Sequence, residues 1–151
     1  MGKEIDLLSK YPKAKRDLTK RLESKTEEVR SVARKFDKEF FDGERKFGYG
    51  GFSYNSRYWS EVVKDFSNYY NLNDGSRILD VGCAKGFMLY DFYKLNSNLD
   101  LHGIDISKYA IDNSVPEIKD KLQVANATKL PYEDNSFDLV IAINTIHNLD
   151  K

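Results

Sequence analysis

Two acidic residues and the short loop between them are the part of this sequence best suited to chemistry. Asp80 shortly precedes a loop of small residues from Gly82 to Gly86, and Asp105 follows about 20 residues after that loop. Glycines allow close backbone approaches that a side chain would block. Carboxylates on either side of such a loop would attract a positively charged ligand and would repel a pyrophosphate. We therefore expect a pocket for a cationic, nucleoside-like molecule.

The spacing within the loop disfavours two common nucleotide sites. In a G-x-G-x-x-G pattern that begins at Gly82, the second and third glycines are replaced by Ala84 and Phe87. The Phe87 ring would obstruct the close contact between helix and strand that the third glycine allows. The loop also lacks the G-K-[ST] ending of a P-loop. A nicotinamide-dependent oxidoreductase therefore stays open only as a disfavoured alternative.

Strands must bring these residues to a common edge, and the sequence predicts an alternation of strands and helices. The predicted strands cover residues 77–81, 99–104, 122–125 and 137–143, and the predicted helices cover residues 87–95 and 108–114. Such alternation is typical of a doubly wound, mostly parallel α/β sheet, which binds ligands at the carboxyl ends of its strands. The apolar run from Leu139 to Ile143 further predicts a strand that is covered on both faces.

Upstream of this sheet, we expect a helical cap over residues 26–72 and a polar, basic leader over residues 1–25. Ser24 and Glu27 form a capping box, which predicts one helix from about residue 27 to about residue 40. A second amphipathic helix is expected from Trp59 onward. Its expected buried stripe consists of Trp59, Val62, Val63, Phe66 and Tyr69 or Tyr70. The leader is expected to be weakly ordered or to dock as a helix.

Composition and charge limit the possible functions. The chain of 151 residues is 40% hydrophobic and 32% charged, with a formal net charge of zero, as expected of one soluble globular domain. Its first 46 residues carry 14 basic and 10 acidic side chains. A phosphate-bearing or nucleic-acid partner for that stretch is an alternative, but a solvated leader is favoured because nucleic-acid-binding domains are usually basic overall. We expect no nucleic-acid partner and no membrane partner.

Few side chains suit redox or metal chemistry. Cys83 is the only cysteine, which fits a reducing compartment and favours a cytoplasmic location. The two histidines, His102 and His147, are separated from each other and from Cys83, so no metal site is expected. His102 lies in a predicted strand and is expected to be packed there.

The segment Ile78-Leu-Asp-Val-Gly-Cys-Ala-Lys-Gly86 resembles motif I of class I S-adenosylmethionine-dependent methyltransferases, with Ala84 in place of the middle glycine. Alanine there leaves the backbone path open. Three further segments match the family in its order along the chain: residues 102–107, 125–131 and 134–147. The resemblance covers residues 73–151, which become the cofactor-binding α/β domain. It implies a Rossmann-like methyltransferase fold with strand order 3-2-1-4 and S-adenosyl-L-methionine as cofactor.

The resemblance also implies roles for individual residues. Asp105 would accept both ribose hydroxyls, and Ile106 would lie against the adenine face. Asn126 replaces the family's usual Asp and could accept a hydrogen bond from the adenine amino group, while Ala127 would offer a backbone N–H. The backbone around Asn144 would face the methionine portion. The full set of expected cofactor-binding residues is Asp80, Gly82, Cys83, Ala84, Gly86, Asp105, Ile106, Asn126, Ala127 and Asn144.

No catalytic residue is assigned, although His147 is a candidate for a general base or else a structural residue. Lys85 could meet a carboxylate or a substrate anion, and a solvent-facing lysine is the favoured interpretation. The aromatic-rich stretch upstream of the sheet has two interpretations: core packing, or a segment that folds over the cofactor and shapes the acceptor pocket. That stretch contains Tyr49, Phe52, Tyr54, Arg57 and Trp59.

The family's sheet has seven strands, whereas this sequence ends just after the fourth. The fourth strand would then be an apolar edge, so we expect a fragment of a longer protein or, alternatively, a second copy that covers the edge. No [DN]-P-P-[YFW] signature follows that strand, which disfavours amide-like acceptor nitrogens. The expected function is methyl transfer to an O, N or C atom of a small-molecule or sugar-like acceptor. The alternative is a non-catalytic or truncated cofactor-binding module that needs a partner or the missing C-terminal half.

Overall fold

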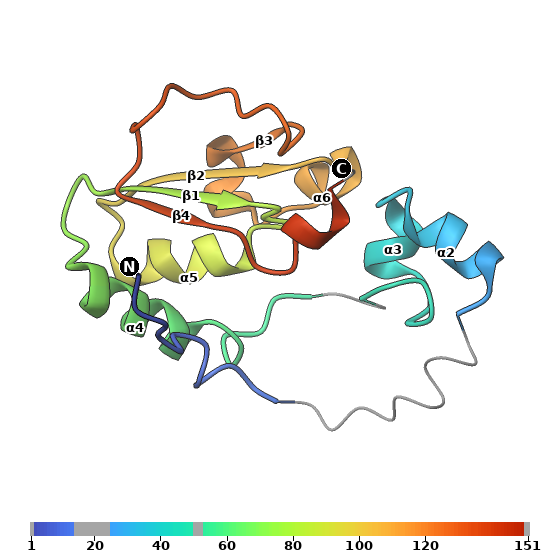
Figure 1. Ribbon diagram of the computed structural model, residues 1–151, viewed down its shortest axis with the longest axis horizontal. Helices are drawn as coiled ribbons and strands as arrows, with labels where there is room; N and C mark the ends of the chain where they lie inside the picture. The colour runs from blue at the N-terminus through green and yellow to red at the C-terminus, as the bar shows by residue number, and fades with distance from the viewer. Residues whose placement is uncertain (1, 14–24, 50–52, 150–151) are drawn as a thin grey trace.

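The computed structural model describes residues 2–13, 25–49 and 53–149, and Figure 1 shows their arrangement. The elements in chain order are α2 (Glu27–Ala33), α3 (Lys38–Asp42), α4 (Ser60–Tyr70), β1 (Arg77–Val81), α5 (Phe87–Leu95), β2 (Asp100–Asp105), α6 (Lys108–Asp112), the 3-10 helix η1 (Pro116–Lys121), β3 (Leu122–Val124), β4 (Leu139–Ile141) and the 3-10 helix η2 (Ile146–Asn148). The strand β1 and the helix α5 match their predicted bounds to the residue.

The four strands form one parallel sheet in the order β3-β2-β1-β4, so the predicted fold class and strand order are confirmed. Asp80 in β1 pairs with Gly103 in β2 and with Ile141 in β4, and Asp105 in β2 pairs with Val124 in β3. Because all strands run the same way, the loops that follow them gather at one edge of the sheet. Ligands of open α/β sheets bind at such an edge.

Most of the hydrophobic core lies on the face of the sheet that is covered by helices. Ile78 and Leu101 point into a cluster with Val63 from α4 and with Leu89 and Phe92 from α5. Figure 1 shows α4 and α5 lying together on that face. A smaller cluster of Leu79, Val81 and Ile104 occupies the opposite face, where the segment between β3 and β4 packs over it.

The prediction that the fourth strand is covered on both faces is wrong for the described residues. Leu139 and Ile141 are buried, whereas 55% of the intervening Val140 is exposed. β4 is also the outer strand of the sheet, next to β1. Val140 lies on the same face of the sheet as Leu79, its partner in β1, and the segment between β3 and β4 that packs over Leu79 leaves the Val140 side chain largely exposed to solvent.

The single helix predicted over residues 27–40 is in fact two short helices, α2 and α3. The backbone of Phe36 adopts a left-handed conformation with φ of 48°, which ends the helical path. Asp37 then caps α3, because its side chain accepts a hydrogen bond of 2.8 Å from the Lys38 N–H. The N-cap of α2 is Thr26, whose hydroxyl accepts from the Val29 N–H, and Ser24 of the predicted capping box lies outside the described residues.

The predicted buried stripe of α4 is confirmed in part. Val62, Val63 and Phe66 are buried, but Tyr69 and Tyr70 are 49% and 44% exposed. The helix ends at Asn71, which is left-handed, and the following Leu72 packs against the core in place of the tyrosines. The stripe therefore ends one turn earlier than predicted.

The described part of the leader packs against α4. The Tyr11 ring lies 4.7 Å from the Trp59 ring, centroid to centroid, and Lys10 Nζ lies 2.7 Å from the Asp65 carboxylate. The remainder of the predicted leader, residues 14–24, lies outside the described residues. Among the helices of the described ranges, none has the length and apolar character that crossing a bilayer requires.

Candidate cofactor site

The loop after β1 uses three left-handed residues to turn the chain into α5. Gly82, Ala84 and Gly86 have φ values of 82°, 51° and 80°. A side chain at Gly82 would collide with the Thr145 hydroxyl, so glycine is required there for space as well as for conformation. Ala84, at the position of the family's middle glycine, adopts the same left-handed conformation at a cost of about 1 kcal/mol.

Asp105 braces this loop from the end of β2. One carboxylate oxygen accepts a hydrogen bond of 2.8 Å from the Ala84 N–H, and the other accepts one of 2.8 Å from the Ser107 N–H. Burial raises the pKa of Asp105, and the backbone hydrogen bonds act in the opposite direction. Each oxygen keeps a second lone pair, so the carboxylate can hold the loop and still accept a ligand hydroxyl.

Asp80 is a buried acid at the carboxyl end of β1. Burial and the negative charge of Asp105 together raise the pKa of Asp80 to about 7. Among the described residues, it does not belong to those that line the pocket at this edge. A cationic ligand near these two carboxylates would favour the ionised form of Asp80.

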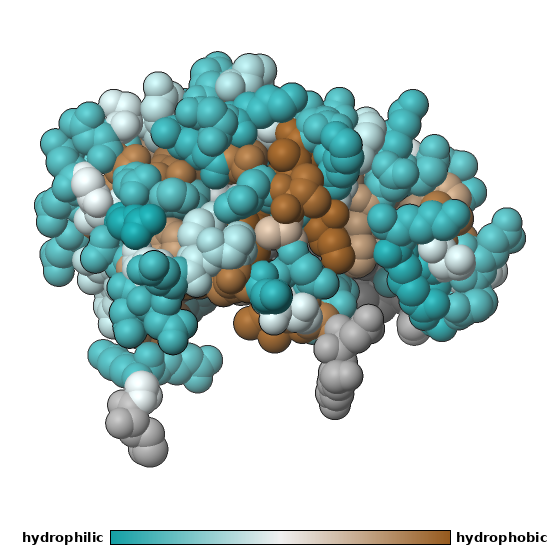
Figure 2. All heavy atoms as spheres, turned by 90° about the horizontal axis from the view of Figure 1, so that it is seen from above, coloured by the Kyte–Doolittle hydropathy of each residue, from teal (hydrophilic) through white to brown (hydrophobic). Residues whose placement is uncertain are grey.

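A pocket lies where the loops after the strands meet α3. Its lining residues are Phe36, Phe40, Phe41, Tyr49, Gly82, Ala84, Ile104, Asp105, Ile106, Ala125, Asn126, Ala127, Ile143, Asn144, Thr145, Asn148 and Leu149. Figure 2 shows a stripe of hydrophobic residues between the α2–α3 part and the rest of the molecule. Seven of the ten predicted cofactor-binding residues therefore contribute to one pocket, drawn from all four strand ends.

The three remaining predicted residues occupy other positions. Asp80 lies at the end of β1 as described above. The Cys83 thiol is buried in the hydrophobic core, where its sulfur lies near Gly103, and burial raises its pKa well above the usual value. Gly86 begins α5 beside Ile118 and Leu122, which leave no room for a side chain. Their positions fit roles in shaping the loop.

Asn126 and Ile106 line the pocket in different ways. Asn126 Oδ1 accepts hydrogen bonds of 2.9 Å from both the N–H and the hydroxyl of Thr128. The Asn126 oxygen that is predicted to accept a hydrogen bond from the adenine amino group therefore closes a local turn. To bond to this oxygen, a ligand would have to replace the hydrogen bond from the Thr128 hydroxyl, which can rotate away. Ile106 is 56% exposed and presents an apolar surface on which a flat ring can stack.

Sequence reasoning missed most of the aromatic wall of the pocket. Phe36, Phe40 and Phe41 line it together with Tyr49, whose ring stacks on Phe41 at 5.8 Å and whose pKa is raised by burial. The sequence predicts Phe36 and Phe40 within one continuous helix, and the left-handed backbone at Phe36 breaks that helix before Phe40.

The other members of the aromatic-rich stretch lie elsewhere. Tyr54 bonds to Asp91 on α5, and Trp59 packs on Tyr11. Arg57 is exposed and its guanidinium lies over the Tyr58 ring. Phe52 lies outside the described residues. The position of Tyr49 fits the interpretation that this stretch shapes the pocket. The positions of Tyr54 and Trp59 fit the alternative, in which the aromatic side chains pack against the rest of the molecule.

The interpretation of Lys85 as a solvent-facing lysine is wrong. Lys85 is only 7% exposed, and its ammonium lies 2.7 Å from both carboxylate oxygens of Asp42. His147 is exposed in η2 and is not among the lining residues of the described chain, although Thr145 and Asn148 are. His102 is packed as expected, between the rings of Tyr132 and Phe137.

Comparison with known proteins decides the family. A family model described as a methyltransferase domain matches residues 72–151, which is more than half of the chain. The chain belongs to the class I S-adenosylmethionine-dependent methyltransferase family. The chain is 36% identical over 115 residues to phosphoethanolamine N-methyltransferase 3 of Arabidopsis thaliana, a match that covers 72% of this chain and 22% of that protein. The chain thus spans about a fifth of that relative's length.

A further relative and two solved structures are also similar to this chain. The chain is 31% identical over 85 residues to 27-O-demethylrifamycin SV methyltransferase of Amycolatopsis mediterranei, a match that covers 52% of this chain and 31% of that protein. Among solved structures, MccD protein aligns with a TM-score of 0.46 and 29% identity over 52% of this chain and 37% of that one. Phosphoethanolamine N-methyltransferase 2 of Haemonchus contortus aligns with a TM-score of 0.48 and 22% identity over 64% and 23%.

Proposed function

We propose that this methyltransferase binds S-adenosyl-L-methionine in the pocket at the carboxyl edge of its sheet and transfers the methyl group to a small-molecule acceptor. The observation that carries the proposal is Asp105, which braces the Gly82–Gly86 loop and also lines the pocket. The cofactor supplies a methyl group that its sulfonium already activates. The residues of this chain bind, orient and shield the reactants, since positioning supplies most of the rate of a direct displacement.

The donor set of the pocket suits this cofactor. Asp105 offers carboxylate oxygens for ribose hydroxyls, and the apolar side chains of Ile106 and Ala127 form a wall for a purine ring. Asp80 adds a second acid at the same edge of the sheet, which favours a ligand with positive charge over one with a pyrophosphate. A dinucleotide is disfavoured for the same reason.

The acceptor is proposed to be a small molecule methylated at an O, N or C atom. The names of two relatives support this class, because phosphoethanolamine and 27-O-demethylrifamycin SV are both small molecules. Because these two acceptors differ, the relatives do not indicate which atom of the acceptor is methylated. We propose neither a nucleic-acid nor a membrane partner, and a cytoplasmic location fits the single cysteine, which is buried in the core.

A second candidate is a cofactor-binding module that needs a partner for turnover. The exposed Val140 on the outer strand β4 favours it, because an apolar outer strand gains stability when another strand or a second copy covers it. Turnover that appears only when further polypeptide is added, with unchanged cofactor affinity, would support this candidate over an independently active chain.

Calorimetric titration with S-adenosylhomocysteine tests the proposal. We expect one site per chain, and competition by S-adenosylmethionine but not by NADH. Radioactive methyl transfer to a panel of small amines, alcohols and phenols then tests the acceptor class. Well-folded protein that binds neither S-adenosyl compound would contradict the proposed function.

A further inference from the structure

A partly buried ion pair links the loop after β1 to the helix α3. The Lys85 ammonium lies 2.7 Å from each oxygen of the Asp42 carboxylate, and the Lys85 side chain is 8% exposed. The Tyr109 hydroxyl donates a further hydrogen bond of 2.6 Å to Asp42 Oδ2. One carboxylate is thus held by donors from two separate elements of the sheet region.

The ion pair connects two walls of the candidate cofactor pocket. Lys85 directly follows Ala84, which lines the pocket and donates to Asp105. Asp42 is the last residue of α3 and directly follows Phe40 and Phe41, which line the pocket from the other side. Figure 1 shows α3 beside α6, the helix that carries Tyr109 and lies next to the carboxyl edge of the sheet.

The part of the N-terminal cap that contains α2 and α3, which precedes α4, has little hydrophobic burial of its own. In the described chain, α2 has no buried residue, and Phe41 is the buried residue of α3. The Lys85 side chain is 8% exposed and that of Asp42 is 26% exposed, so the loss of either partner removes an ion pair that is partly shielded from solvent and destabilises the docked position of α3. The position of the aromatic wall therefore depends strongly on the Lys85–Asp42 contact.

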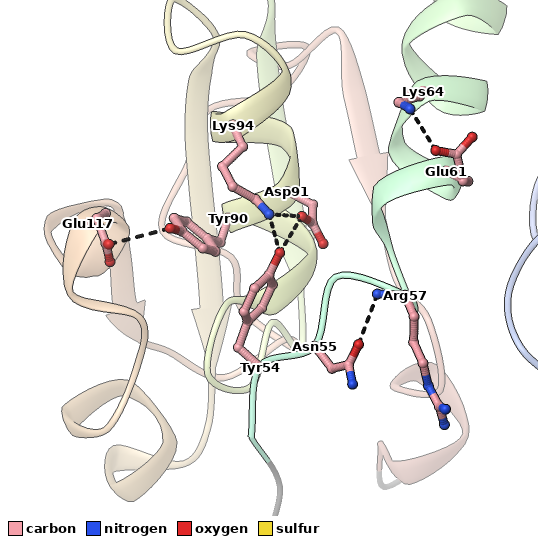
Figure 3. A network of polar contacts seen from close by, with 9 residues as sticks. All are labelled: Tyr54, Asn55, Arg57, Glu61, Lys64, Tyr90, Asp91, Lys94 and Glu117. Atoms are coloured by element: carbon pink, nitrogen blue, oxygen red, sulfur yellow. Dashed lines mark hydrogen bonds and ion pairs between the residues drawn. The ribbon is translucent and has the colours of Figure 1, made fainter.

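The cap is attached again where it returns to the sheet region. The Tyr54 hydroxyl donates a hydrogen bond of 2.7 Å to Asp91 Oδ1, and Lys94 Nζ lies 2.7 Å from the same oxygen (Figure 3). Asp91 is buried on α5, and the Lys94 ammonium lies over the rings of Tyr54 and Tyr90. Tyr49 lies in the segment between these two attachments, Asp42 and Tyr54.

We propose that Lys85 is a positioning residue for cofactor binding. By holding Asp42, it docks Phe40, Phe41 and Tyr49 against the pocket, and the docked cap slows the release of the cofactor. This inference rests on the proposed function, because it assumes that the pocket binds an S-adenosyl compound. It gives a role to Lys85, a motif I side chain that does not line the pocket.

The test compares Lys85→Met and Asp42→Asn with the wild-type chain in two measurements. Hydrogen–deuterium exchange over residues 38–49 reports cap docking, and exchange over β1 serves as the internal reference. The dissociation rate of S-adenosylhomocysteine, measured by competition, reports retention. In both variants we expect faster exchange in the cap, unchanged exchange in β1, and a dissociation rate raised about tenfold, because the undocked fraction from which the cofactor leaves rises about tenfold.

Matched controls separate positioning from general stability. Lys108→Met removes an exposed ion pair with Asp112 on the neighbouring α6, at the same distance of 2.7 Å, and should change neither measurement. Lys85→Arg keeps the charge and should restore slow release, and the double variant of Lys85 and Asp42 should release no faster than either single one. Should Lys85→Met not fold, Asp42→Asn carries the same test.

Two results would overturn the inference. One is an unchanged exchange of the cap in both variants; the other is a loosened cap with wild-type release of S-adenosylhomocysteine. Failure of the wild-type chain to bind S-adenosylhomocysteine would instead reject the proposed function, while the exchange measurement would still report whether the ion pair docks the cap.

Discussion

The sheet region of this chain and the part of the N-terminal cap that contains α2 and α3 are held in place by different kinds of contact. In the sheet region, β1 and α5 are held by buried neighbours such as Ile78, Leu89 and Phe92, whose relative exposure is essentially zero. In the cap, α2 and α3 bury little and are attached through polar contacts such as Lys85–Asp42. The sheet region therefore contributes most of the free energy of unfolding. The α2–α3 part of the cap contributes side chains to the pocket and little to that free energy.

The largest contrast is expected from equal deletions in the two regions. Phe92→Ala removes a fully buried ring and should lower the free energy of unfolding by about 3–5 kcal/mol. Phe40→Ala removes a partly exposed ring from α3 and should lower it by about 1 kcal/mol, while weakening S-adenosylhomocysteine binding. Urea unfolding followed by circular dichroism measures both. Equal losses would contradict the division between the two regions.

The pH dependence of stability is expected to come from the sheet region. The pKa of Asp80 in the folded state is about 7, above its usual value of 3.8, so the folded state binds this proton more tightly. The contribution of Asp80 to stability therefore falls as pH rises from about 4 to about 7, by on the order of 3 kcal/mol. Asp80→Asn should remove this fall.

Thermal unfolding of the wild-type chain and Asp80→Asn at pH 5 and pH 8 measures the effect. The melting temperature of the variant relative to wild type should be higher at pH 8 than at pH 5. Because the pKa of Asp105 is also raised, the stability of both proteins should still fall somewhat as the pH rises. A difference that is independent of pH would contradict the burial of an ionising Asp80.

The third expected effect concerns Asp105, which accepts hydrogen bonds from the loop after β1 and also lines the pocket. Asp105→Ala removes the acceptor of the Ala84 and Ser107 N–H groups and the expected partner of the ribose. S-adenosylhomocysteine affinity should fall roughly a hundredfold, since hydrogen bonds to a charged group contribute about 1.5–3 kcal/mol. Calorimetry measures the affinity. Asp112→Ala, an exposed acid on α6, serves as the control and should bind normally.

The smallest expected effect is a slight gain in stability from a substitution at Ala84. Ala84 has a φ of 51°, a conformation that glycine adopts without strain. Ala84→Gly should relieve about 1 kcal/mol of local strain, partly offset by the greater freedom of the unfolded chain. Thermal unfolding should show an unchanged or slightly raised melting temperature, with cofactor affinity preserved. A clear loss of stability would show that the Ala84 methyl group packs usefully.

These contrasts also explain what the sequence could predict. Local periodicity predicted β1 and α5, because buried apolar residues dominate those elements, and the resemblance to the methyltransferase family supplied the strand order. It could not predict the burial of Lys85, because the partner Asp42 lies 43 positions away in sequence. The left-handed Phe36 divided an apparently continuous helix and turned Phe40 and Phe41 toward the pocket.

The sequence predicted the pocket residues that belong to a backbone motif. It did not predict features that depend on how side chains pack in the folded chain. Gly82, Ala84 and Asp105 follow from the strand–loop–helix pattern, and they line the pocket. The use of Asn126 Oδ1 to close a turn with Thr128 depends on a local geometry that spacing does not reveal. The exposure of Val140 likewise depends on which elements lie beside β4.

A crystal structure of the chain grown with S-adenosylhomocysteine tests the central claim most directly. The account predicts the ligand in the pocket between Ile106 and Gly82, with its ribose hydroxyls within hydrogen-bonding distance of the Asp105 carboxylate and the α3 aromatic wall beside it. A ligand bound elsewhere, or Asp105 directed away from the ribose, would contradict it.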